Sequence, residues 1–202
     1  MRLTVMQAGF LDATPIQRGK LVDFFADRKK PSEAIQVAEE FWQKHKNETR
    51  RIQRVQGIIH SLYLGQARSL LEFERLLYLY TALDACYAHY ENIMTVTRRP
   101  SHAKRIQWMC TTVGIEVPKW ADPGSAKNSE VSLARNNAIH EALFFDKPLG
   151  FASFGASASG SLNVILEMQA LTSRLLVALL GRPNCKYVKS PVNTRMQHAL
   201  DL

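Results

Sequence analysis

Apolar residues recur at intervals of three and four along most of this chain, which is the spacing of an amphipathic helix. The strongest pattern follows Ser69, whose residue type caps helices, and continues through Leu76, Tyr80 and Leu83 to Tyr90. The same spacing predicts further helices over residues 15–29, 31–46, 48–64, 101–113, 128–145 and 161–180. The chain is therefore expected to be all-α.

Proline and glycine interrupt the pattern between helices, most clearly at Pro100 and in the loop over residues 114–127. Five of the predicted helices fall between residues 48 and 181, with short connections that suit a helical bundle. The chain is accordingly expected to have three parts, namely an N-terminal helical appendage (1–47), the bundle (48–181) and a loosely held C-terminal tail (182–202).

Charge favours a polyanionic partner. The 202 residues carry a formal net charge of +8, and contacts from Lys and Arg to phosphate release counterions from a nucleic acid. One basic group flanks Pro100, and its members are the candidate RNA contacts Arg98, Arg99, Lys104 and Arg105. An ordinary solvated basic face explains such a group equally well.

Other features narrow the class of protein. Cys86, Cys110 and Cys185 are too far apart for a zinc-ligand pattern and do not suggest a disulfide framework, so a reducing, cytoplasmic setting is expected. The sequence contains no glycine-rich phosphate loop and no metal-ligand cluster, so neither a metal nor a cofactor is expected. No apolar run approaches the roughly 18 residues of a membrane span, and no membrane partner is expected.

The richest chemistry lies at residues 135–141, within the helix predicted over residues 128–145. Arg135, Asn136, Asn137, His140 and Glu141 place a permanent cation, two amides, an imidazole and a carboxylate within seven positions. Arginine binds phosphate bidentately and keeps its charge, and histidine exchanges a proton near neutral pH. This set is sufficient for phosphodiester chemistry on RNA without a metal.

Two other parts of the sequence bear on this assignment. Arg54 and His60 have a similar spacing, but they lie in a plain helical run with no amide beside the arginine, so residues 135–141 are favoured. Asp84 lies in the apolar stretch of the long helix, where a carboxylate needs a partner. Arg135 or His140 would make Asp84 an orienting residue, whereas the alternative is an edge position that faces solvent.

The Arg-Asn-x-x-x-His pattern of residues 135–140 follows a long apolar helix that contains the sequence LYTALDA at residues 79–85. This combination on an all-α bundle resembles the HEPN superfamily (higher eukaryotes and prokaryotes nucleotide-binding domain). In particular, it is similar to the HEPN domain of ApeA-type anti-phage defence proteins. The resemblance covers roughly residues 50–181. It implies a HEPN-like bundle of four to five helices with an N-terminal appendage.

The resemblance further implies a metal-independent endoribonuclease that works as a homodimer, often as a toxin or a defence effector. Arg135 and His140 match the arginine and histidine of the family motif, and Asn136 matches its polar second position. Members controlled by an antitoxin carry a tyrosine two residues after the histidine. Ala142 stands there in this chain, so regulation by modification of that tyrosine is not expected.

The predicted reaction is attack of a ribose 2′-hydroxyl on the adjacent phosphorus. His140 would serve as general acid or base, Arg135 would stabilise phosphoryl charge, and Asn136 would position either group. Glu141, Asn137 and Asp84 would support them. The expected partners are RNA and a second copy of the chain, with an antitoxin or a larger defence assembly as a further possibility. The alternatives are a non-catalytic module that binds RNA, a nucleotide or a protein, and a structural dimerisation domain.

Overall fold

The computed structural model describes residues 31–67, 69–94, 99–124, 128–141 and 164–192, and all regular secondary structure in these ranges is helical. The elements, in chain order, are α3 (Pro31–His45), α4 (Thr49–Gly65), α5 (Glu72–Ile93), the 3₁₀ turn η1 (His102–Lys104), α6 (Arg105–Val113), the 3₁₀ turn η2 (Lys119–Ala121), α7 (Glu130–His140), α8 (Val164–Leu179) and α9 (Lys186–Lys189). The predicted all-α class is confirmed. The helix predicted over residues 15–29 lies outside the described residues.

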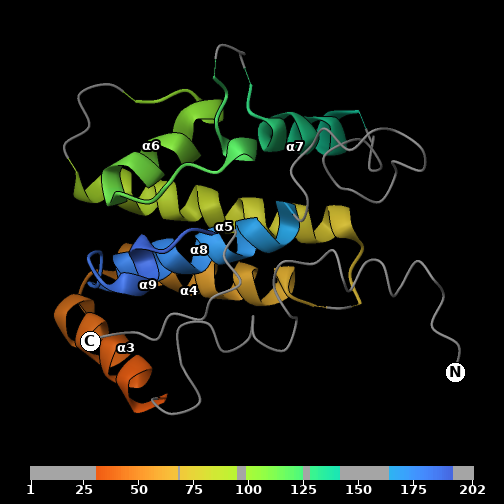
Figure 1. The fold of residues 1–202 in the computed structure, drawn as a ribbon. Coiled ribbons are helices and arrows are strands. Elements are labelled where there is room, and N and C mark those ends of the chain that lie inside the picture. Colours follow the sequence, from red (N-terminus) through yellow and green to blue (C-terminus); the bar gives the residue numbers. More distant parts are fainter. Residues whose placement is uncertain (1–30, 68, 95–98, 125–127, 142–163, 193–202) are drawn as a thin grey trace, which may run out of the picture.

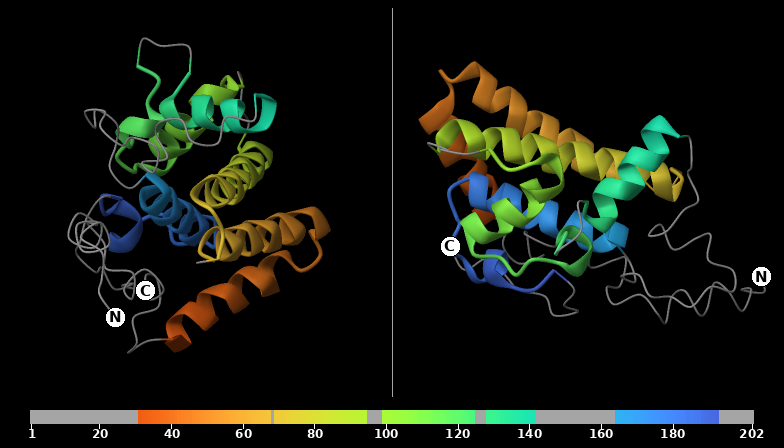
Figure 2. Two further views of the ribbon diagram at one scale, coloured as in Figure 1. Left: turned by 90° about the vertical axis from the view of Figure 1, so that its right-hand side faces the viewer. Right: turned by 90° about the horizontal axis from the view of Figure 1, so that it is seen from above.

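The helices form a bundle around α5 and α8 (Figure 1). The end-on view in Figure 2 shows α6 and α7 on one side of this pair and α4 and α3 on the other. Every residue of α8 except Glu167 is buried, as expected for a helix that is apolar on nearly all sides. The inner face of α4 carries the buried residues Ile52, Val55, Ile58 and Leu62, whereas Ile59 of the same apolar pattern is 49% exposed.

Gly65 sets how closely α4 approaches α5. A Cβ atom at this position would lie 2.7 Å from the Cγ atom of Leu79, which is itself fully buried. The helix predicted over residues 48–64 stops just before Gly65. In the structure Gly65 is the last residue of α4, and its missing side chain leaves room for a leucine of the neighbouring helix.

Two predicted helix ends are wrong. The long helix begins at Glu72 with Leu71 at the N-cap, instead of at Ser69, because the Glu74 carboxylate accepts a hydrogen bond of 2.7 Å from the Leu71 backbone N–H. The helix that carries residues 135–140 ends at His140 instead of near residue 145. Its start agrees with the prediction, since the Ser129 side chain accepts the Ser132 backbone N–H.

The segment expected to be a loosely held tail packs on α8 over its described part, residues 182–192. Arg174 of α8 is 4% exposed and donates to the backbone oxygens of Ser190 (2.8 Å) and Pro191 (3.0 Å). Its guanidinium also lies 4.8 Å from the ring centroid of Tyr187, a buried residue of α9. These contacts were not visible in the sequence because Arg174 is a single polar interruption in an apolar helix.

None of the described helices has the length and apolar character needed to cross a bilayer.

Glu167 offers a test of the core. Burial raises the pKa of its carboxyl group, the hydrogen bond from Trp120 Nε1 (2.8 Å) offsets part of this effect, and the nearby Glu130 charge adds to it. A carboxyl whose pKa is raised by folding stabilises the folded state below its unfolded pKa and loses this contribution as pH rises through its folded pKa. Glu167→Gln keeps an oxygen for Trp120 and removes the charge. We therefore expect its melting temperature to exceed that of the wild type by a few degrees at pH 7.

Thermal melts at pH 7 and near pH 4 measure this effect. The difference in melting temperature should disappear at the lower pH, where the wild-type Glu167 carboxyl group is also uncharged. Glu116→Gln removes a charge at an exposed position and is the matched control. A Glu167→Gln protein that melts below the wild type at pH 7 would show that the hydrogen bond to Trp120 requires the charged oxygen.

Candidate functional site

The polar residues predicted to form the site, at positions 135–141, lie along the outer flank of α7 and at its C-terminal end. Val131, Ala134 and Ala138 form the buried face of this helix. Arg135 is half-buried beside that face, whereas His140 is exposed at the last helical position. Five positions correspond to about 140° of rotation, so the two motif side chains leave the helix in different directions.

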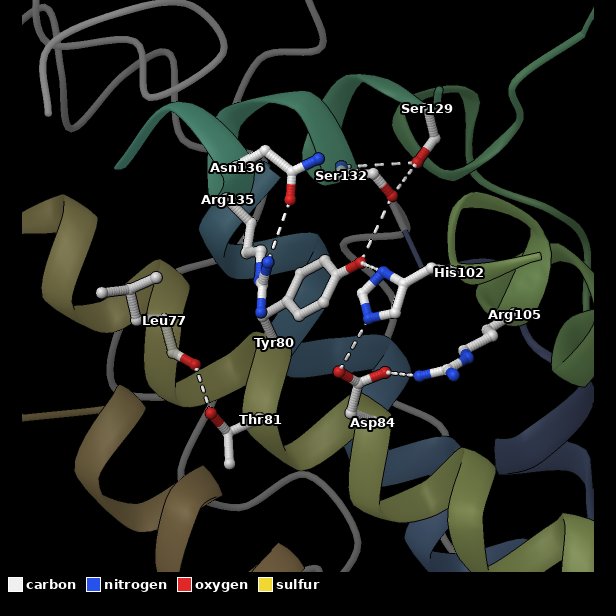
Figure 3. Close-up of polar contacts among 10 residues, drawn as sticks. All are labelled: Leu77, Tyr80, Thr81, Asp84, His102, Arg105, Ser129, Ser132, Arg135 and Asn136. Atoms are coloured by element: carbon white, nitrogen blue, oxygen red, sulfur yellow. Dashed lines mark hydrogen bonds and ion pairs between the residues drawn. The ribbon is translucent and has the colours of Figure 1, made fainter. Parts of the chain in front are cut away.

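Arg135 is held by two uncharged groups. Its guanidinium lies 5.9 Å from the ring centroid of Tyr80 on α5 and donates a hydrogen bond of 3.0 Å to Oδ1 of Asn136. Figure 3 shows the side chain between these two partners. Within the described ranges, Arg135 forms no ion pair. A cation–π contact and an amide hydrogen bond restrict the side chain without neutralising it, so its charge remains available to an anion.

A chain of polar contacts fixes Tyr80 from the other end (Figure 3). The Tyr80 hydroxyl lies 3.1 Å from Nδ1 of His102 and 3.3 Å from Oγ of Ser132. Nε2 of His102 lies 3.3 Å from one oxygen of Asp84, and Arg105 donates to the other oxygen at 3.1 Å. We call Tyr80, Asp84, His102, Arg105 and Ser132 the Tyr80 network. It joins α5, the η1–α6 segment and α7.

The Tyr80 network is a positioning device. Burial raises the pKa of the Tyr80 hydroxyl, the Ser132 hydrogen bond offsets part of the rise, Asp84 adds to it, and Arg135 and Arg105 lower it. The net shift is upward, so Tyr80 is a neutral phenol near pH 7. Both ring nitrogens of His102 have partners and its ring stacks on Tyr80 at 5.6 Å. The network therefore fixes the ring against which Arg135 rests.

Asp84 does not have the partner that the sequence suggested. Its carboxylate contacts His102 and Arg105 instead of Arg135 or His140. The reason is tertiary, because η1 and the start of α6 pack over this part of α5 and bring an imidazole and a guanidinium group to the carboxylate. Asp84 is nonetheless linked to Arg135 indirectly, through His102 and the Tyr80 ring.

The described members of the basic group around Pro100 do not form one continuous basic surface. Arg105 turns inward, 4.6 Å from the ring centroid of Tyr87 and in contact with Asp84. Arg99 is 79% exposed and pairs with Glu91 at 2.8 Å, and Lys104 is exposed. Arg98 lies outside the described residues. Only Arg99 and Lys104 therefore remain as described solvent-facing cations from this group.

The remaining predicted residues lie near the end of α7. Asn137 is half-buried, and its backbone oxygen accepts the Glu141 N–H at 3.0 Å, which closes the last turn. His140 and Glu141 are exposed. In the part of the chain that the structure describes, the His140 side chain has no hydrogen-bond partner. The similarly spaced Arg54 instead donates to the Ala88 backbone oxygen at 2.9 Å, while His60 is exposed.

Sequence reasoning missed Tyr80, His102 and Ser132 as members of the site. Tyr80 read as a core aromatic residue, yet it precedes Asp84 by four positions, which places both on one face of a helix. That polar pair in an apolar helix was a usable signal. His102 gave none, because its role depends on how the segment after Pro100 packs on α5.

Two negative findings bear on this site. Among the described residues, no three His, Cys, Asp or Glu side chains gather in a way that could hold a metal ion. Comparisons with protein-family models, with curated proteins and with solved structures find no match to this chain.

Proposed function

We propose that this protein is a metal-independent endoribonuclease of the HEPN type, with a HEPN-like bundle and a role as a toxin or an anti-phage defence effector. The observation that supports this function best is the environment of Arg135. Its guanidinium is fixed by Tyr80 and Asn136, both uncharged, so it is oriented and still cationic. A preorganised cation of this kind stabilises charge that develops on a phosphoryl group.

The proposed reaction is an internal transesterification. The ribose 2′-oxygen bonds to the adjacent phosphorus as the bond to the 5′-oxygen breaks. A base removes the 2′-hydroxyl proton, and an acid protonates the departing 5′-oxygen. His140 supplies one of these roles, Arg135 binds the non-bridging oxygens, and Asn136 holds the guanidinium in place. The products are a 2′,3′-cyclic phosphate and a 5′-hydroxyl end.

The test is cleavage of a labelled RNA by the purified chain in EDTA. We expect cleavage to continue, and we expect an otherwise identical substrate with one 2′-deoxy nucleotide at the cut site to resist, because the nucleophile is missing. End-group analysis of the products measures the cyclic phosphate or its hydrolysed form. Activity that is lost in EDTA and restored by a divalent ion would contradict the proposal.

We further propose a homodimer with α7 near the two-fold axis. Leu133 and Ile139 on this helix are 50% and 48% exposed, and burying such residues against a second copy is favourable. Two facing α7 helices would bring two His140 side chains to one site, which would supply both an acid and a base. We expect Ile139→Lys to weaken the dimer and reduce cleavage together.

Sedimentation and activity across a dilution series check the assembly. Ile59→Lys is the matched control, since Ile59 is 49% exposed on α4 and lies away from α7. It should leave both measurements unchanged. A strictly monomeric species with full specific activity would exclude a composite site between two chains.

A second function is favoured by one observation. His140 has no partner in the described ranges that would fix its ring, whereas a catalytic histidine is usually oriented by a second group. This arrangement fits a non-catalytic module that binds RNA through Arg135. Such a module would leave RNA intact at high protein concentration, while Arg135→Ala would still weaken RNA binding.

A further inference from the structure

A second polar site lies at the C-terminal end of α5, away from the Tyr80 network. Here the first turns of α4 meet the last turns of α5 and line an open pocket of about 290 Å³. Three arginines of α4, Arg50, Arg51 and Arg54, line it together with His89 of α5. Glu48, Thr49 and Asn92 complete the polar lining. The volume is near the lower end of the range for small-ligand pockets.

The three arginines lie in the first two turns of α4. Arg54 is anchored by its hydrogen bond of 2.9 Å to the Ala88 backbone oxygen. Arg51 is anchored by the Glu48 carboxylate at 2.9 Å, and Arg50 is exposed at the pocket. Glu48 also occupies the N-cap position but makes no side-chain capping hydrogen bond. The pocket lining thus carries three arginines and one carboxylate.

His89 is the second, independent observation. The side chain is 2% exposed and lines the pocket, and its Nε2 atom has no hydrogen-bond partner among the described residues. Burial lowers the pKa of His89 to about 4, with further lowering by Arg51, Arg54 and His45, and Glu48 opposes the change. The ring is therefore neutral near pH 7. A buried polar atom without a partner is uncommon and costs free energy, so a ligand group that bonds to Nε2 would gain from it.

We propose that this pocket binds the phosphoryl group of a small phosphorylated molecule. The guanidinium groups of Arg51 and Arg54 match the oxygens of a phosphate, and the N-terminus of α4 adds backbone N–H donors and a favourable dipole. The remaining oxygen accepts a hydrogen bond from Nε2 of neutral His89. The proposal does not depend on the ribonuclease, because the pocket shares no residue with the Tyr80 network or with α7.

The experiment is a titration of the full-length protein followed by NMR at pH 7 and constant ionic strength. The probes are inorganic phosphate, pyrophosphate and a nucleoside 5′-monophosphate, with sodium chloride as the reference anion. We expect saturable shifts of the His89 ring signals and of the backbone amides of Thr49, Arg50 and Arg51. Tighter binding of the nucleotide than of free phosphate would identify a phosphorylated metabolite as the ligand, and the reverse order would identify the free anion.

Two variants decide whether the pocket is responsible. Arg50→Gln changes an exposed side chain and should preserve the fold, and Arg54→Gln removes the anchored cation. We expect each to weaken phosphate binding, with about a tenfold loss for Arg54→Gln. Arg99→Gln removes the same charge outside the pocket and should change affinity by less than about twofold. Equal losses in all three variants, shifts that never saturate, or chloride binding as tight as phosphate would overturn the proposal.

Discussion

Replacing Arg135 with alanine is expected to reduce RNA cleavage by about 100- to 1,000-fold, the loss found when one preorganised donor to a developing oxyanion is removed. The side chain is half-buried on the flank of α7, away from the buried face formed by Val131, Ala134 and Ala138. Its removal therefore leaves the main packing of the helix intact. Circular dichroism and thermal melting should remain close to those of the wild type while activity falls.

Arg135→Lys sharpens this test. Lysine retains the charge but lacks the planar fork that contacts the Tyr80 ring and a phosphate at once. We expect it to recover only part of the activity, because the cation is no longer held by Asn136 and Tyr80 in the same geometry. His140→Ala should also abolish cleavage, since the proposed proton transfer is lost.

His60→Ala is the matched control for these variants. His60 is exposed on α4 and belongs to the rival Arg-to-His spacing. Its replacement should leave activity within a few fold of the wild type. Full activity in a folded His140→Ala protein would remove the histidine from the mechanism, and a large loss in His60→Ala would move the site to α4.

Helical periodicity located most of the helices because the bundle buries one face of each, whereas α8 is buried on nearly all sides and was marked by its apolar composition. Ile52, Val55 and Ile58 recur at three-residue spacing and are buried on α4. Helix ends were less predictable, because they depend on local competition between caps. Ser69 had the right residue type, but the Glu74 carboxylate binds the Leu71 N–H and fixes the start of α5 instead.

The candidate site was predicted only in part, because polar partners are set by tertiary contacts. The local pair of Arg135 and Asn136 was within reach of sequence reasoning, since the two residues are adjacent. The Asp84 contact was not, because Arg105 follows 21 positions later and comes from another helix. A carboxylate in an apolar helix indicates that a polar partner exists, but the sequence alone does not identify the side chain that packs over it.

Arg174→Met is expected to lower the free energy of unfolding by about 3 kcal/mol or more, because several hydrogen bonds from one buried cation to uncharged oxygens are lost together. The guanidinium donates to the backbone oxygens of Ser190, Pro191 and Ala170 and to the Ser190 hydroxyl, at 2.8 to 3.0 Å. Methionine fills much of the same volume but offers these oxygens no donor. The Ser190 backbone oxygen would be left buried without this donor, and the Pro191 oxygen and the Ser190 hydroxyl would each lose a hydrogen bond.

Urea denaturation of the full chain measures the change, and hydrogen exchange at Tyr187 and Val188 reports whether residues 186–190 have detached from α8. The matched control is Arg182→Met, which removes an arginine that is paired with Glu40 at the surface. Exposed ion pairs contribute little, so the control should unfold close to the wild-type midpoint. If the two variants lost equal stability, the contacts of Arg174 would contribute no more than a surface pair. In that case the packing of Tyr187 and Val188 alone would hold the segment on α8.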